Sequence, residues 1–257
     1  MRSEDRDAIR ENFLGDEDGH IYFFYRPKAL EAHDVQEIDR LYIVLRPFAS
    51  KTLRLISLDT NQFPEPGSEF NYITGTVERV DSKQYHIVHD LSEKHTQRMG
   101  EPDESQGPAR PCGEGVYTLL DREKAEHLFY IMELPEKGTV SEKLNILKEG
   151  DFVFGVFNPY YGVDPEEMEP TVRPVFPEPL RVKLKNERVV FEDVPRYINF
   201  EGTRVALYRQ DGIVSKSELK AKLHPQKETP KNADIFMDLR MSRERFPVEP
   251  LVKGDFR

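Results

Sequence analysis

Short apolar runs recur along the chain up to Pro159. Ile21–Tyr25 is continuously apolar, and so is every residue from Leu41 to Leu45. A continuous run of this length predicts a strand that is buried on both faces. Leu53–Leu58 gives a weaker strand pattern. Phe70–Val80 alternates with period two, which predicts a long strand or a strand with a bulge at Gly75.

Helices and further strands are predicted around these runs. Polar caps and apolar residues at helical spacing predict helices over Ser3–Leu14, Asp81–Lys94, Thr139–Leu147 and Ser215–Leu223, and a helical turn within His33–Ile38. Short strands are predicted at Leu180–Leu184, Arg188–Phe191 and Val205–Arg209, the first two forming a hairpin. Gly15–Gly19 is expected to be a turn, and the C-terminal RFPVEPLVKGDFR an extended strap.

Two segments carry loop composition instead. Thr96–Gly113 holds three prolines and three glycines without periodicity, which predicts poor order. It is interpreted as a connection between modules, with a functional loop as the alternative. Tyr160–Pro179 holds five prolines and is expected to be an extended connector.

The strand pattern of the first part echoes in the second. Gly19–Pro27, Arg40–Pro47 and Leu53–Asp59 have counterparts at Gly115–Leu120, His127–Pro135 and Asp151–Pro159. The displacement of about 90–100 residues is the size of a small domain and too long for a solenoid repeat. The echo favours two related β-rich modules. The predicted helices do not occupy the same places in the two blocks, so independent hairpins of similar composition are the alternative.

Composition restricts the class of protein. The chain has 257 residues, a formal net charge of −10, and a hydrophobic fraction of 37%. An excess of acid argues against bulk nucleic-acid binding, although Arg240, Arg243 and Arg245 could form a local basic patch. One cysteine cannot form an intramolecular disulfide, which fits a reducing compartment. With no apolar signal or membrane span, a soluble cytoplasmic protein is expected.

Histidine and cysteine supply the candidate catalytic chemistry. His86, His89 and His95 lie close in sequence, and two of them on one helix face could bind a divalent metal with a third ligand. The zincin spacing is absent, so solvent-facing histidines are the favoured interpretation and no cofactor is predicted. Cys112, in RPCGEG, could be a nucleophile if His127 lay beside it as a base. A loop cysteine without a catalytic role is the simpler alternative.

Arginines in apolar strands supply the candidate binding chemistry. Arg26, Arg46 and Arg54 lie within or at the ends of strands, where a guanidinium can bind a carboxylate or phosphate with two hydrogen bonds. Each can equally pair with one of the many acidic side chains, and a ligand site would need a concave pocket.

Several blocks carry a resemblance to a known family. GHIYFFYRP, DRLYIVLRP, ARPCGEGVYTLL, HLFYIMELP, INFEGTRVALY and the ending RFPVEPLVKGDFR resemble an uncharacterised prokaryotic protein family of similar length. The resemblance spans most of the chain. It implies a single unit of conserved length, and it supplies no activity, ligand or catalytic residue.

The expected fold is α+β and dominated by antiparallel strands, with short peripheral helices. Two β-rich modules, residues 1–95 and 114–159, would form a sandwich or paired half-barrels, joined by the connection at 96–113. Residues 160–257 would add a connector, a hairpin, a helix and a strap. As an alternative, all of these parts belong to one compact domain. The protein is expected to be a non-enzymatic binding or interaction module that recognises a protein or a small anionic ligand. A homodimer is one possible oligomeric state. The alternative is a hydrolase, metal-assisted or not, with its site in the cleft between modules.

Overall fold

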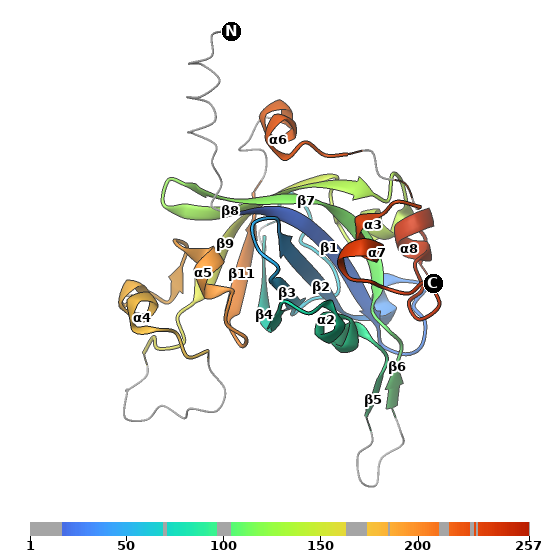
Figure 1. Ribbon diagram of the computed structural model, residues 1–257, viewed down its shortest axis with the longest axis horizontal. Helices are drawn as coiled ribbons and strands as arrows, with labels where there is room; N and C mark the ends of the chain where they lie inside the picture. The colour runs from blue at the N-terminus through green and yellow to red at the C-terminus, as the bar shows by residue number, and fades with distance from the viewer. Residues whose placement is uncertain are drawn as a thin grey trace.

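The chain folds around one closed β-barrel, seen in a computed structural model that describes residues 17–68, 71–96, 104–162, 174–184, 186–210, 216–226, 229 and 231–256. Eight antiparallel strands close the barrel in the order β9, β11, β4, β3, β2, β1, β7, β8 and back to β9, and a ninth, β10, adds to β9 (Figure 1). The strands are β1 (Glu17–Pro27), β2 (Ile38–Pro47), β3 (Leu53–Leu58), β4 (Tyr72–Asp81), β7 (Arg110–Arg122), β8 (Ala125–Leu134), β9 (Glu149–Phe157), β10 (Val189–Val190) and β11 (Arg204–Arg209).

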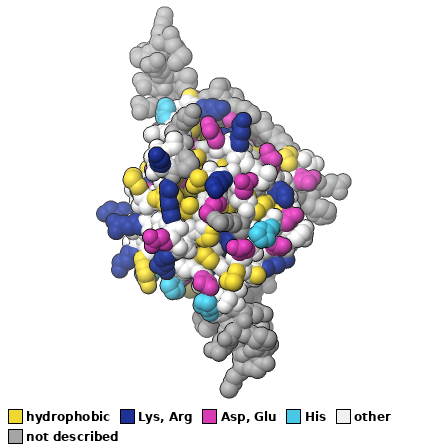
Figure 2. Space-filling view, turned by 90° about the vertical axis from the view of Figure 1, so that its right-hand side faces the viewer, with side chains coloured by type: hydrophobic (Ala, Val, Ile, Leu, Met, Phe, Trp, Pro, Cys, Tyr) yellow, Lys and Arg dark blue, Asp and Glu magenta, His cyan; other side chains and the backbone are white. Residues whose placement is uncertain are grey.

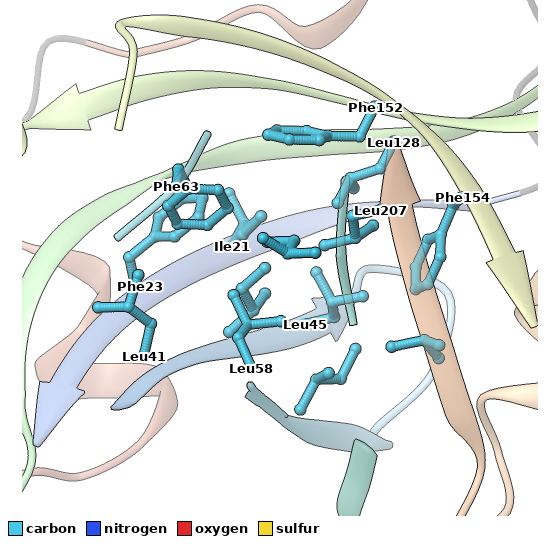
Figure 3. Close-up of a cluster of buried hydrophobic side chains, with 14 of the residues drawn as sticks. Ile21, Phe23, Leu41, Leu45, Leu58, Phe63, Leu128, Phe152, Phe154 and Leu207 are labelled. Carbon is cyan, nitrogen blue, oxygen red and sulfur yellow. The ribbon is translucent and has the colours of Figure 1, made fainter. Parts of the chain in front are cut away.

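The continuous apolar runs are buried on both faces of the sheet, as predicted. In β1, Ile21 and Phe23 belong to the cluster that fills the barrel, whereas Tyr22 and Phe24 belong to a second cluster on the outer wall. Figure 3 shows side chains from opposite strands of the barrel, including Leu45, Phe154 and Leu207, meeting in the interior. An eight-stranded barrel is just wide enough for side chains to fill it. The interior is therefore a packed core.

Short helices cover the wall and the ends of the barrel. Apolar residues of α2 (Gln84–Leu91), α7 (Asp234–Asp238) and α8 (Glu249–Lys253) pack on the outer cluster with β1, β2 and β3. Leu223 of α6 (Lys216–Leu223) covers a smaller apolar patch on β7 and β8. The others are η1 (Val35–Glu37), α3 (Thr139–Lys143), α4 (Glu178–Leu184) and α5 (Val194–Tyr197). α4 and α5 lie on the side of the barrel opposite α3, α7 and α8 (Figure 1).

The prediction of a sandwich or of two half-barrels is wrong. The echoed blocks form β1–β2–β3 and β7–β8–β9, two arcs of the same barrel, and β1 pairs with β7 from Glu17–Leu119 to Tyr25–Arg110. A second seam, between β4 and β11, closes the wall. Alternating inward and outward side chains are common to sandwiches and barrels, so the pattern of one strand does not distinguish them. No cleft separates the two blocks where the β1–β7 ladder joins them.

Several local predictions are confirmed, and others need correction. The strands at 41–45, 53–58 and 205–209 and the helices within 81–94, 139–147 and 33–38 are present. The bulge in β4 falls at Glu78, where the β3–β4 register shifts, and not at Gly75. Residues 180–184 form α4 instead of a strand, and the predicted C-terminal strap contains α8. The predicted helix at 3–14 and the cap Ser215 lie outside the described residues.

Within the segment interpreted as a module connection, the structure describes residues 96 and 104–113, and most of these lie in strands. Residues 94–96 and 104–106 pair as the small ribbon β5 (Lys94–Thr96) and β6 (Glu104–Gln106), which projects from the barrel (Figure 1). Arg110–Gly113 belongs to the long strand β7. Glu17–Gly19, predicted as part of a turn, begins β1. Pairing with a neighbouring strand outweighs the loop-like composition in both places.

Candidate ligand-binding site at one end of the barrel

Arg54 lies at one end of the barrel with its side chain directed inward, on the same side of β3 as Ile56 and Leu58. Its guanidinium forms two parallel hydrogen bonds with Glu17, at 2.5 Å from Nη1 to Oε1 and 2.8 Å from Nη2 to Oε2. Nε donates to Oδ1 of Asn199 at 2.9 Å, and the hydroxyl of Tyr117 donates to Oε1 of Glu17 at 2.7 Å. Three strands and the segment after α5 thus meet in one polar network.

A cavity of about 450 Å³ opens above this network. Its walls are Glu17, Pro47, Ala49, Ser50, Thr52, Arg54, Val80 and Asn199. This volume lies in the range of small-molecule sites, which often occupy the mouths of β-barrels. Because Arg54 is 3% exposed and Glu17 11% exposed, the network forms a fixed floor, whereas the β2–β3 turn supplies a more accessible rim with the hydroxyl groups of Ser50 and Thr52.

The electrostatics of the floor favour a ligand without net charge. Glu17 neutralises Arg54, so a simple anion gains little from the guanidinium and meets the carboxylate beside it. Three of the five N–H groups of a guanidinium are used in the hydrogen bonds described above, which leaves two as donors. Burial, and next the charge of Glu17, hold the pKa of Tyr117 well above its usual value, so this hydroxyl stays a donor.

The other two candidate arginines are engaged in structural contacts. Arg26 is fully buried on the outer wall and donates to the carbonyl oxygens of Asp90, Ser92 and Gly107, each at 2.9 Å. It thereby satisfies carbonyl groups at the end of α2, which otherwise lack helical partners. Arg46 is about one third exposed, and its Nε lies 3.1 Å from Oδ2 of Asp238 in α7. Of the three candidates, Arg54 is the one that lines a cavity described here.

The three clustered histidines do not converge. His86 contacts Asp81 close by in sequence, while the side chains of His89 and His95 are 69% and 70% exposed. Among the described residues, no group of three histidine, cysteine or acidic side chains could hold a metal ion. Their placement agrees with solvent-facing histidines on a polar surface.

Cys112 and His127 lie on opposite faces of the barrel wall. Cys112 is fully buried in the interior cluster, and this burial raises the pKa of its thiol. His127 packs against the ring of Phe129, which belongs to the outer patch under α6, and its Nδ1 lies 2.9 Å from Oδ1 of Asp151. A buried thiol with a raised pKa is a poor nucleophile, and the histidine is not beside it. The placement argues against a cysteine–histidine pair.

The basic residues near the C-terminus do not form a continuous basic face. Arg240, Arg243 and Arg245 are exposed. Figure 2, which views the side of α3, α7 and α8, shows Lys and Arg at one margin and also across the face, where acidic side chains lie between them. Mixed charge of this kind suits solubility better than a nucleic-acid interface.

Glu17 and Asn199 were not predicted as site residues. Glu17 stands in an acidic stretch, DEDG, whose members are equivalent by composition. Asn199 gains its role only because α5 brings it to the barrel end. An arginine inside an apolar strand was the available signal, and it identified Arg54 alone. A second arginine, Arg209, lies at the opposite end of the barrel. It donates to the carbonyl of Asn145 at 3.1 Å, and its Cζ lies 5.6 Å from the centroid of the Phe152 ring.

A second, smaller cavity of about 250 Å³ lies between the end of β8 and α3, with Met132, Pro135, Ile146 and Leu147 among its walls. Within the described part of the chain, no helix has the length and hydropathy needed to cross a bilayer. No family model, no curated protein and no solved structure matches the chain. The assignment of the candidate site therefore depends on its geometry.

Proposed function

We propose that the protein is a non-enzymatic binding protein that takes a small, uncharged, hydroxyl-rich ligand in the cavity at the Arg54 end of the barrel. The observation that carries this proposal is the cavity of about 450 Å³ floored by the Arg54–Glu17 pair. The floor supplies fixed donors from Arg54 and acceptors from Glu17, and Ser50 and Thr52 add hydroxyl groups at the rim. A polyol or a monosaccharide matches this mixture because each hydroxyl both donates and accepts.

A binding role fits the site better than a hydrolytic one. Both carboxylate oxygens of Glu17 accept hydrogen bonds from Arg54, and Oε1 also accepts one from Tyr117, so the carboxylate is fixed in a structural network. The small anionic ligand expected from the sequence is disfavoured here because Glu17 already occupies the guanidinium.

Calorimetric titration tests the proposal with two sets of probes. Erythritol, ribose and glucose represent the uncharged class, and inorganic phosphate and citrate represent the anions. At least one uncharged probe is expected to bind, with affinity reduced about fivefold or more by Thr52→Val, which removes one rim hydroxyl. Ser82→Ala, at an exposed position outside the cavity, is the matched control and should bind like the wild type.

Two results would overturn the proposal. Saturable binding of phosphate or citrate without binding of the uncharged probes would assign the cavity to anions. Uncharged probes that bind the wild type and Thr52→Val equally would place the ligand elsewhere on the molecule.

A further inference from the structure

A cluster of charged and polar side chains fastens α7 to the outside of the barrel. Nδ1 of His20 lies 2.7 Å from Oδ2 of Asp238, and Nε2 of the same ring lies 3.2 Å from Oδ2 of Asp234. The Tyr22 hydroxyl donates to Oδ2 of Asp238 at 2.6 Å, and Nε of Arg46 lies 3.1 Å from the same oxygen. His20 therefore bridges two carboxylates of one short helix.

A further carboxylate holds the start of the same helix. Glu114 of β7 accepts hydrogen bonds from the backbone N–H groups of Asp234, at 2.7 Å, and Ile235, at 3.1 Å. On the same face of β1, Asp18 lies 3.8 Å from Nζ of Lys222 in α6. Around His20 the acidic groups are thus Asp234, Asp238, Glu114 and Asp18, and the cations are Arg46 and Lys222.

The same cluster adjoins the rim of the Arg54 cavity. At the end of β2, successive residues face the cluster and the cavity in turn. Arg46 contacts α7, and the ring centroids of Phe48 and His20 lie 4.8 Å apart, whereas Pro47 and Ala49 line the cavity. The N–H of Phe48 also donates to the carbonyl of Asp18 at 2.8 Å. A shift of α7 would remove the contact of Arg46 with Asp238 and would release the His20 ring, against which Phe48 packs.

We propose that His20, Asp234 and Asp238 form a pH-sensitive clasp that holds α7 and, through Arg46 and Phe48, the rim of the ligand cavity. The clasp is closed while His20 is protonated, because the imidazolium then bridges two carboxylates. When His20 loses its proton, Arg46 is the remaining cation in direct contact with Asp238. The rim then loosens, and ligand affinity falls. This regulation rests on the proposed function, although the clasp itself can be measured without a ligand.

The sign of the pH dependence follows from the surroundings of His20. Burial, the largest single influence, lowers its pKa, but the hydrogen bond with Asp238 and the charges of Asp234 and Asp238 outweigh burial, so the pKa is raised from 6.5. A raised pKa means that the clasp is fully formed below 6.5 and is lost as the pH rises through the raised value. Burial likewise opposes the shift of Asp238, but its hydrogen bonds from His20 and Tyr22 lower its pKa below 3.8.

Between pH 6 and pH 9 His20 is thus the group of the clasp whose charge changes. Burial, and next the charge of Asp238, hold the pKa of Tyr22 well above 10, so this hydroxyl does not titrate in that range. The clasp equilibrium can change by about tenfold for each unit by which the His20 pKa is raised.

Amide hydrogen exchange between pH 6 and pH 9, corrected for the intrinsic exchange rate, tests the clasp directly. The amides of Asp234, Ile235 and Phe48 are expected to lose protection together as the pH rises. His20→Gln should show the loosened behaviour at every pH, and Asp238→Asn provides a second variant that removes the other half of the contact. His89→Gln, at an exposed histidine, should keep the wild-type profile. Calorimetric titration of the uncharged probe that binds best, at both pH values, adds the ligand readout.

The outcomes separate the clasp from the proposed function. If exchange follows pH but no uncharged probe binds, the clasp stands and the proposed function falls. If a probe binds with the same affinity at both pH values while the three amides stay equally protected, the function stands and the clasp is overturned. Exchange that rises equally with pH in His20→Gln also overturns the clasp.

Discussion

Arg26 and Gly107 are joined by a hydrogen bond of 2.9 Å from Nη1 to the carbonyl oxygen, across 81 positions of sequence. The same guanidinium binds the carbonyls of Asp90 and Ser92, so one side chain connects β1, the end of α2 and the segment that leads into β7. These contacts are structural because the arginine is fully buried and these three partners are backbone groups.

Replacing Arg26 by methionine is expected to destabilise the fold by about 3 kcal/mol or more, because three carbonyl groups, including that of the buried Gly107, lose their donor. Chemical denaturation measures the change. The matched control is Arg40→Met, since Arg40 faces Arg26 in the β1–β2 register but is 43% exposed. The control should cost less than about 0.5 kcal/mol. Equal losses in the two variants would contradict the structural role.

Cys112 is expected to resist thiol reagents in the folded protein. It is buried in the barrel interior and its thiol has a raised pKa, so reaction requires local or global opening. Reaction with a chromogenic disulfide at pH 8 should be at least about 100-fold slower in buffer than in denaturant. Fast reaction of the native protein would instead restore Cys112 as a candidate nucleophile.

Gly115 marks a place where β7 and β8 approach too closely for a side chain. A Cβ atom there would lie 2.0 Å from the carbonyl oxygen of Ile131. Gly115→Ala is expected to cost about 1–3 kcal/mol because the ladder must shift, and thermal denaturation should show a lower melting temperature. At Gly162 a Cβ would meet nothing within 4 Å, so Gly162→Ala isolates the backbone cost at its positive φ. A larger loss at Gly162 than at Gly115 would contradict the steric explanation.

Asn199 is expected to position Arg54 instead of supporting the fold as a whole. Its Oδ1 accepts from Nε of Arg54 at 2.9 Å at the floor of the cavity. Asn199→Ala should lower stability by about 1 kcal/mol, the net value of one such hydrogen bond, and weaken binding of an uncharged probe. Denaturation and calorimetric titration measure the two effects. Unchanged affinity together with lower stability would leave Asn199 a purely structural role.

The buried strands of the barrel could be predicted from the sequence because other residues cover both faces of the barrel wall there. Burial of Ile21 and Phe23 inside and of Tyr22 and Phe24 outside produces a continuous apolar run, which is an unambiguous signal. Residues 180–184, LRVKL, show the limit of this signal. The alternation fits a strand, but Leu180 and Leu184 are also four residues apart, and in the structure both are buried from one face of α4.

The closure of the barrel and the candidate site depend on contacts that local patterns do not encode. Arg54 was identified because a cation inside an apolar strand requires a partner. Its partner Glu17 lies on a strand that is not adjacent to β3, since β2 runs between them. His20 and Asp238 are 218 positions apart, and no sequence pattern distinguishes them from the other histidines and acidic residues of the chain. Long-range pairings of this kind follow from the three-dimensional fold.

The seam between β4 and β11 also sets the order in which the barrel can be completed during synthesis. β4 is made early, but its neighbour on one side is Arg204–Arg209, which is synthesised after the other seven strands of the barrel. Until then the growing chain presents the edge of β4 as a row of unpaired backbone groups, a template for pairing with other chains. A chain that ends before Arg204 would keep this edge permanently open, which makes it prone to association through β4.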